Sequence, residues 1–186
     1  TTLETVPAEM PYIQADPART EKWAAIIDQD SFTVGITWAG SRKFKNDYNR
    51  SCPLKEFEPF AGIEGIKLYG LQKGPGSEQS EEVKNLLPIT SLGEDFDDFA
   101  DTAGAIQNLD LVISVDTSVL HLAGAMGKKT WAMIPYTPDW RWLLDTDRSP
   151  WYPTVRIFRQ REFQNWPEVI GRMAGELEDL RLTIYD

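Results

Sequence analysis

The chain has 186 residues, with 29 acidic and 19 basic side chains, a formal net charge of −10, one histidine and one cysteine. The acidic balance argues against nucleic acid or an anionic membrane surface as a general partner, and a single cysteine cannot form an internal disulfide. No stretch is long enough to span a membrane and no signal peptide is evident, so we expect an intracellular, cytoplasmic protein.

Residues 1–30 are predicted to be a linker that contains one helix. Three prolines interrupt this segment, and a helical pattern over residues 18–29 has no strand before it. A helix without a preceding strand fits a connector better than the start of a domain. We therefore place the domain at residues 31–186.

From residue 31 on, short apolar runs alternate with segments of helical periodicity. The apolar runs have the composition of buried parallel strands and occupy residues 33–38, 66–72, 89–93, 110–115, 130–135 and 155–160. Helical spacing is found at residues 54–62, 80–87, 97–108, 118–126 and 166–180. This alternation predicts an α/β fold with a Rossmann-like, doubly wound and mainly parallel sheet.

The segment VISVDTSVLHLAGAMG, residues 112–127, changes from strand to helix, and polar residues are concentrated at the change. Asp116 and Thr117 form the predicted turn, and Ser118 begins the helix. The start of a helix carries unpaired N–H groups and a partial positive charge, so it can bind phosphate oxygens. Capping by one of these three side chains is the alternative. His121 follows one helical turn later and is expected to project toward the same edge, although a structural role is its alternative.

Two other predicted strand ends carry basic or polar side chains. Four cations follow the first strand: Arg42, Lys43, Lys45 and Arg50. Gln72 and Lys73 follow the second strand. Because the carboxyl ends of parallel strands meet at one edge of a sheet, a cationic loop beside the helix start would complete a diphosphate site. A solvated charged loop is the alternative for any single one of these residues.

Four motifs in chain order resemble a known family, and they occupy residues 35–51, 68–74, 98–135 and 138–160. They resemble the C-terminal part of bacterial proteins with tetratricopeptide repeats and a glycosyltransferase-like region. That region is similar to the lipopolysaccharide heptosyltransferases and, more distantly, to the O-linked N-acetylglucosamine transferases. The resemblance implies a GT-B arrangement of two Rossmann-like domains, of which this chain resembles the C-terminal, donor-binding half.

The resemblance also implies roles for single residues. Thr117 and Ser118 would contact the diphosphate of a nucleotide sugar, and Asp116 would face the donor sugar or phosphate. His121 stands where the heptosyltransferases also have histidine, whereas the N-acetylglucosamine transferases have an acidic ribose-binding residue there. The phosphate-binding cation of these enzymes would correspond to one residue of the first loop: Lys43, Lys45 or Arg50.

The expected partners are a nucleotide sugar, an N-terminal acceptor domain and tetratricopeptide repeats of the same protein. The resemblance places the usual catalytic base in the other domain, so we assign no catalytic residue in this chain. GT-B-like enzymes neutralise the leaving diphosphate with helix ends and cations, so we expect no metal and no cofactor. The triplets Asp95-Phe96-Asp97 and Asp145-Thr146-Asp147 resemble the metal-diphosphate motif of the other main glycosyltransferase fold, but such triplets arise easily in an acidic chain.

The predicted function is therefore donor binding for glycosyl transfer, and a catalytically silent scaffold or binding module is the alternative. A dinucleotide oxidoreductase is disfavoured because the first strand is not followed by G-x-G-x-x-G. By itself the chain is expected to bind nucleotide weakly and to transfer no sugar, because half a cleft leaves the diphosphate exposed to water. The tryptophans between residues 131 and 151 are expected to be core or interface, with the surface near Trp140 and Trp142 partly exposed.

Overall fold

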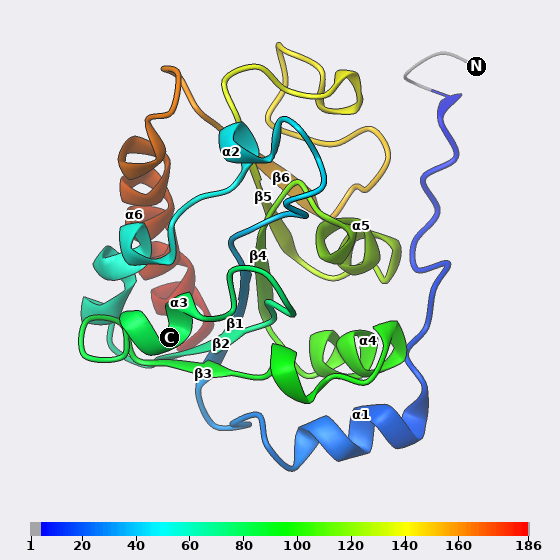
Figure 1. Ribbon diagram of the computed structural model, residues 1–186. Helices are drawn as coiled ribbons and strands as arrows, with labels where there is room; N and C mark the ends of the chain where they lie inside the picture. Colours follow the sequence, from blue (N-terminus) through cyan, green and yellow to red (C-terminus); the bar gives the residue numbers. More distant parts are fainter. Residues whose placement is uncertain (1–4, 186) are drawn as a thin grey trace.

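The computed structural model describes residues 5–185, and side chains up to residue 180. Its centre is a six-stranded parallel sheet in the order β3-β2-β1-β4-β5-β6 (Figure 1). The strands are β1 Phe32–Thr37, β2 Ile66–Gly70, β3 Ile89–Ser91, β4 Leu111–Val115, β5 Thr130–Ile134 and β6 Val155–Arg159. This order is that of a doubly wound Rossmann-like sheet, so the predicted fold class is confirmed.

Helices connect the strands and follow the predicted pattern with some differences. The helical segments are α1 Pro17–Ala24, α2 Asp47–Arg50, α3 Gln79–Glu82, α4 Phe99–Gln107, α5 Ser118–Ala125 and α6 Trp166–Tyr185, with 3₁₀ segments η2 Leu54–Gly62, η3 Gly93–Asp95 and η4 Trp140–Trp142. Residues 54–62 form a 3₁₀ helix and not the expected α-helix, and Pro59 lies inside it, where a proline ring would clash with the preceding turn of a regular α-helix. The helix predicted over residues 80–87 is a single short turn, Gln79–Glu82, and residues 83–86 continue as turns.

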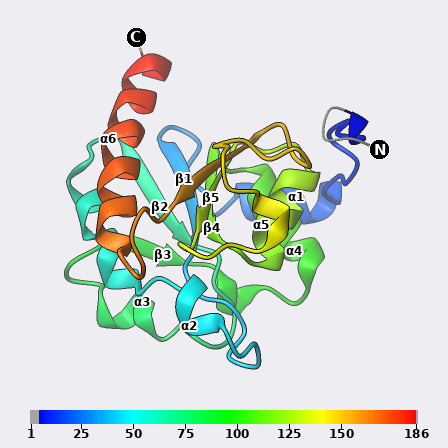
Figure 2. The same ribbon diagram turned by 90° about the horizontal axis from the view of Figure 1, so that it is seen from above.

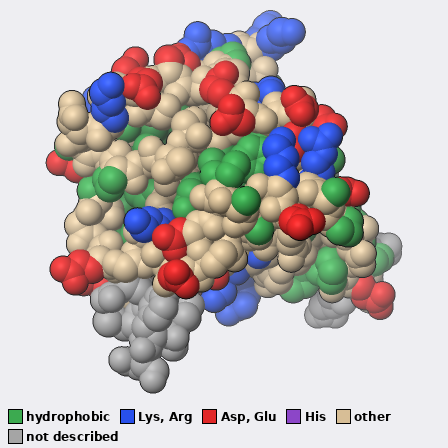
Figure 3. Space-filling view, turned by 90° about the horizontal axis from the view of Figure 1, so that it is seen from below, with side chains coloured by type: hydrophobic (Ala, Val, Ile, Leu, Met, Phe, Trp, Pro, Cys, Tyr) green, Lys and Arg blue, Asp and Glu red, His purple; other side chains and the backbone are tan. Residues whose placement is uncertain are grey.

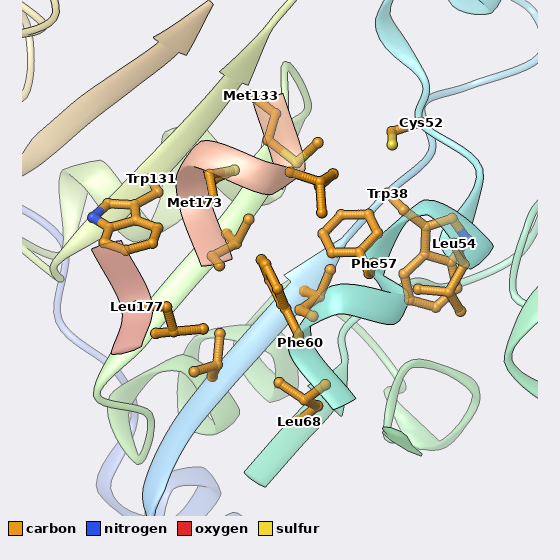
Figure 4. Close-up of a cluster of buried hydrophobic side chains, with 14 of the residues drawn as sticks. Trp38, Cys52, Leu54, Phe57, Phe60, Leu68, Trp131, Met133, Met173 and Leu177 are labelled. Carbon is orange, nitrogen blue, oxygen red and sulfur yellow. The ribbon is translucent and has the colours of Figure 1, made fainter. Parts of the chain in front are cut away.

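One face of the sheet is covered by η2, α3 and α6. Alternate residues of β1 point to this face, as the period of a strand requires, and join a buried cluster with the covering helices. Figure 4 shows Met173 and Leu177 of α6 together with Trp131 and Met133 of β5, in the same cluster as Phe60 of η2. Burial of this apolar surface fixes the helices on the sheet.

The other face is covered by α4 and α5, and α1 packs on the outside of α4 (Figures 1 and 2). Trp23 of α1 is fully buried and meets Phe96 edge to face, with 4.9 Å between ring centroids. Ile27, just after α1, belongs to the same cluster. The assignment of residues 1–30 as a linker stays a prediction, but α1 contributes side chains to the core.

The surface mixes charges of both signs. Figure 3, which views the side where α1 and β3 lie, shows acidic and basic side chains interspersed around a central hydrophobic area. In the part of the chain that the structure describes, no helix is both long enough and apolar enough to cross a membrane.

A buried carboxylate joins α1 to α4. Asp101 is inaccessible to solvent and lies within reach of four donors: Lys22 Nζ at 3.0 Å, Trp23 Nε1 at 3.1 Å, the Asp97 N–H at 2.9 Å and Arg19 Nη1 at 2.6 Å. Burial acts to raise the pKa of Asp101, but these donors favour the carboxylate by more, so the pKa lies well below its ordinary value.

Replacing this carboxylate should destabilise the fold. We expect Asp101→Ala to lower the free energy of unfolding by about 3 kcal/mol in urea titrations near neutral pH, because two cations and an indole lose their partner. Asp95→Ala, which removes an exposed carboxylate nearby, is the matched control and should change stability by less than about 0.5 kcal/mol.

The loss of unfolding free energy in Asp101→Ala should depend on pH, and the lowered pKa of Asp101 gives the direction of that dependence. A carboxyl whose pKa is lowered on folding stabilises the protein above its unfolded pKa of about 3.9 and loses that contribution as the pH falls toward the folded value. The difference between wild type and Asp101→Ala should therefore be constant from about pH 7 to 5 and shrink below about pH 4. A difference that stays constant into stronger acid would contradict this role for Asp101.

Candidate functional site

A cleft of about 510 Å³ opens at the carboxyl ends of β1, β2 and β4. The chain leaves β1 and β4 toward opposite faces of the sheet, so their connections diverge and leave a space between them. This is the place where doubly wound sheets bind ligands. The walls come from the loops that follow these three strands and from the residues that open α4.

The start of α5 forms one wall of the cleft. As predicted, β4 ends at Val115, Thr117 is the N-cap and Ser118 begins the helix. Thr117 makes no side-chain capping hydrogen bond, and its hydroxyl lies 3.1 Å from that of Ser114 instead. Among residues 5–185, the N–H groups of Thr117 and Ser118 have no acceptor. Because both residues line the cleft, unpaired donors at the positive end of a helix border this space.

Arg50 is the cation of the loop after β1 that the structure places at the cleft. Its Nε donates to Asp47 Oδ1 at 2.9 Å, and its Nη1 donates to the carbonyl oxygen of Asp116 at 2.9 Å. The guanidinium also lies over the ring of Phe44, 4.5 Å from the centroid. No acceptor for Nη2 is present in the described part of the chain, so Arg50 keeps donors for a ligand. A Cβ on Gly40 would come within 2.6 Å of the guanidinium, so this glycine leaves room for Arg50.

The other cations of this loop lie elsewhere. Arg42 pairs with Glu78 at 2.7 Å and is largely exposed. Lys43 and Lys45 are exposed on the same loop and are not among the residues that line the cleft. Their predicted part in phosphate binding stays a prediction.

Gln72 and Lys73 line the cleft from the end of β2. Gln72 is buried, accepts the N–H of Ala39 at 3.0 Å and donates to the carbonyl of Pro75 at 3.0 Å, so it ties the loops after β1 and β2 together. Lys73 donates from Nζ to the carbonyl of Phe96 and so connects the β2 loop to the segment before α4. Both side chains hold the walls of the cleft in place.

His121 lies on another side of the α5 start. Its Nδ1 is 3.1 Å from the hydroxyl of Tyr152, its Nε2 is 3.5 Å from Asp116 Oδ1, and its ring stacks on Trp142 with 5.7 Å between centroids. It lines a second cleft of about 270 Å³ together with Trp140. The structure therefore does not bring His121 beside Thr117 and Ser118 in the first cleft.

Asp116 stands between the two clefts. Its carbonyl is bound by Arg50 from the first cleft, and its carboxylate faces His121 in the second. Burial acts to raise the pKa of Asp116, whereas His121 and the indole of Trp142 lower it by more, so its pKa lies below the ordinary value. Asp116 is therefore ionised near neutral pH.

Several cleft residues were not predicted. They come from the end of β1 and from the start of α4: Thr37, Asp97, Asp98, Phe99 and Thr102. The hydroxyl of Thr37 is buried without a hydrogen-bond partner among the described residues. A signal for the α4 group was present, because a predicted strand at 89–93 precedes a predicted helix at 97–108, and this junction also lies at the carboxyl edge.

The tryptophans divide into buried and exposed groups. Trp131 and Trp142 are buried, and Trp142 belongs to a cluster with Leu120 and Ile134. Trp140 is 70% exposed. The surface near this pair is therefore partly exposed, as expected: Trp140 is exposed, whereas the indole of Trp142 is buried and stacks on His121.

Comparisons with known proteins identify a family and a relative. The sequence model of glycosyltransferase family 9 (heptosyltransferase) matches residues 74–172, just over half of the chain. Protein FlbA of Caulobacter vibrioides (strain ATCC 19089 / CIP 103742 / CB 15) is 29% identical over 187 residues, which cover 96% of this chain and 30% of FlbA.

Solved heptosyltransferase structures share the fold. The E. coli ADP-heptose lps heptosyltransferase II has a TM-score of 0.67 and 14% identity over 95% of this chain and 55% of that chain. The E. coli heptosyltransferase WaaC with ADP has a TM-score of 0.58 and 15% identity over 95% and 52%. WaaC with ADP-2-deoxy-2-fluoro heptose has a TM-score of 0.58 and 13% identity over 93% and 52%. The chain thus spans about half the length of these structures, and the expected likeness to heptosyltransferases is confirmed.

The contacts of Arg50 predict that Arg50 contributes more to stability than Arg42, which lies on the same loop. We expect Arg50→Met to lower the free energy of unfolding by about 1.5 kcal/mol, because a half-buried guanidinium loses hydrogen bonds to Asp47 and to the Asp116 carbonyl. Arg42→Met should change stability by less than about 0.5 kcal/mol, since its ion pair is exposed. Equal losses in the two variants, measured by urea unfolding, would show that Arg50 does not fasten the loop to β4.

Proposed function

The chain belongs to glycosyltransferase family 9, and on that basis we propose that it binds a nucleotide sugar as the donor for glycosyl transfer, with the diphosphate in the cleft at the start of α5. One observation carries this proposal. The unpaired N–H groups of Thr117 and Ser118 border the cleft at the positive end of a helix, next to the free donors of Arg50. Such an arrangement binds phosphate oxygens.

The same groups would assist the chemistry of transfer. When the bond between the sugar and the diphosphate breaks, negative charge develops on the leaving nucleoside diphosphate. The start of α5 and Arg50 are fixed in position before that charge appears, so they would stabilise it without reorganisation. In a chain of net charge −10, this local concentration of donors is what would make an anion favourable here.

The solved relatives support the class of donor. WaaC structures contain ADP or ADP-2-deoxy-2-fluoro heptose, which makes ADP the first nucleotide to test with this chain. We place the donor sugar toward Asp116, whose carbonyl and carboxylate face the two clefts. In this proposal the acceptor and the catalytic base lie on another domain of a longer protein, as the GT-B arrangement implies.

A pair of substitutions at one position tests the helix amides directly. Ser118 is the first residue of α5, a position that tolerates proline, and Thr117 before it has φ −136° and ψ 171°, which a residue before proline adopts readily. Ser118→Pro should therefore fold and lose one N–H donor. We expect it to weaken ADP binding about tenfold or more in isothermal titration calorimetry, the cost of losing a hydrogen bond to a charged group.

The control is Ser118→Ala, which keeps the N–H and should bind ADP within about threefold of wild type. Melting temperatures of both variants establish that the fold is intact. Equal ADP affinity of the proline and alanine variants would contradict placement of the diphosphate at this amide. Failure of the wild-type chain to bind ADP, GDP, UDP, CDP or inorganic pyrophosphate would contradict the proposal as a whole.

A further inference from the structure

The cleft that we assign to the diphosphate has an acidic rim. Asp97 and Asp98 line it, and their side chains are 80% and 58% exposed. Two carboxylates in the same cleft as a bound diphosphate would repel it. At least one of them is needed for the fold, because Asp98 Oδ1 accepts the N–H groups of Ala100 and Asp101 and so caps α4.

Arg19 of α1 lies next to the two rim carboxylates. Its guanidinium lies 2.6 Å from the buried Asp101, 3.6 Å from Asp97 and 3.9 Å from Asp98. One guanidinium therefore lies within ion-pair distance of three carboxylates, and two of these border the cleft. Lys22, one turn further along α1, is 3.0 Å from Asp101, and no ion pair joins it to Asp97 or Asp98 within the described residues.

The fold holds Arg19 in this place. A Cβ on Gly104 would come within 2.8 Å of the Arg19 backbone, so the close approach of α1 to α4 depends on this glycine. Asn108 Nδ2 donates to the carbonyl of Thr20 at 2.9 Å and fixes the helices relative to one another. The residues matched to the family begin at 74, so α1 lies outside that match.

We propose that Arg19 is a positioning residue for donor binding, which neutralises Asp97 and Asp98 and so lets a nucleoside diphosphate occupy the cleft. The inference rests on the proposed function and extends it. It makes α1, which the sequence presents as part of a linker, a component of the donor site. Removing the charge of Arg19 leaves the rim acids uncompensated, and their repulsion of the diphosphate is the effect to measure.

The test is a cycle of variants with ADP affinity measured by calorimetry at low salt. Arg19→Ala should weaken ADP binding about three- to tenfold, and the loss should shrink at about 0.5 M salt because rim and ligand charges are screened. Adding Asp97→Asn and Asp98→Asn to Arg19→Ala should return the affinity to within about twofold of wild type, since asparagine still caps α4. Lys22→Ala, which removes a cation from Asp101 alone, is the matched control and should leave ADP binding unchanged.

Each other outcome overturns the inference. If the triple variant binds as weakly as Arg19→Ala, Arg19 acts only through the fold. If Asp97→Asn with Asp98→Asn weakens binding in the presence of Arg19, the acids hold the nucleotide rather than repel it. If wild type binds ADP, Ser118→Pro weakens it and Arg19→Ala does not, this inference fails while the proposed function stands. If wild type binds none of ADP, GDP, UDP, CDP and inorganic pyrophosphate, both fail.

Discussion

The parallel pairing of β1 with β4 is the main geometric constraint on the cleft. These central strands run side by side, with Val34 opposite Leu111 and Thr37 opposite Ser114, yet the chain leaves them toward opposite faces of the sheet. The carboxyl ends of β1 and β4 therefore lie side by side at one edge of the sheet, and neither of the segments that follow these strands covers the space between them. The loop that carries Arg50 and the turn that begins α5 meet there because the register leaves them at the same height.

Charge is the second constraint. The chain is strongly acidic, so a site for an anion needs positive potential brought in at short range, where screening is least effective. The structure supplies it from three separate elements: the start of α5, Arg50 at the end of α2, and Arg19 on α1. The buried Asp101 anchors Arg19 and Lys22 to α4, so the packing of α1 and the electrostatics of the cleft depend on the same carboxylate.

The sequence predicts the sheet well because its strands are buried and therefore apolar. All six strands lie where short apolar runs occur, and the turn of Asp116, Thr117 and Ser118 lies where polar residues interrupt such a run. These are local patterns. The 3₁₀ helix at 54–62 has the apolar spacing of an α-helix, and only the proline inside it shows that regular hydrogen bonding is broken.

The details of the site could not be predicted because they depend on contacts between distant segments. Four cations share the loop after β1, and Arg50 is the one at the cleft because it reaches the carbonyl of Asp116, 66 residues later in the chain. His121 has the spacing to face the same edge as Ser118, but Tyr152 and Trp142 hold its ring in another cleft. The sequence pattern of α5 alone does not show these contacts of His121 with Tyr152 and Trp142.

A crystal structure of the chain with ADP would show where the diphosphate binds. We expect phosphate oxygens within hydrogen-bond distance of the N–H groups of Thr117 and Ser118, with the Arg50 guanidinium on the same phosphates. ADP with its phosphates in the second cleft, against His121 and Trp140, would contradict it, as would ADP in the first cleft with both amides left unpaired.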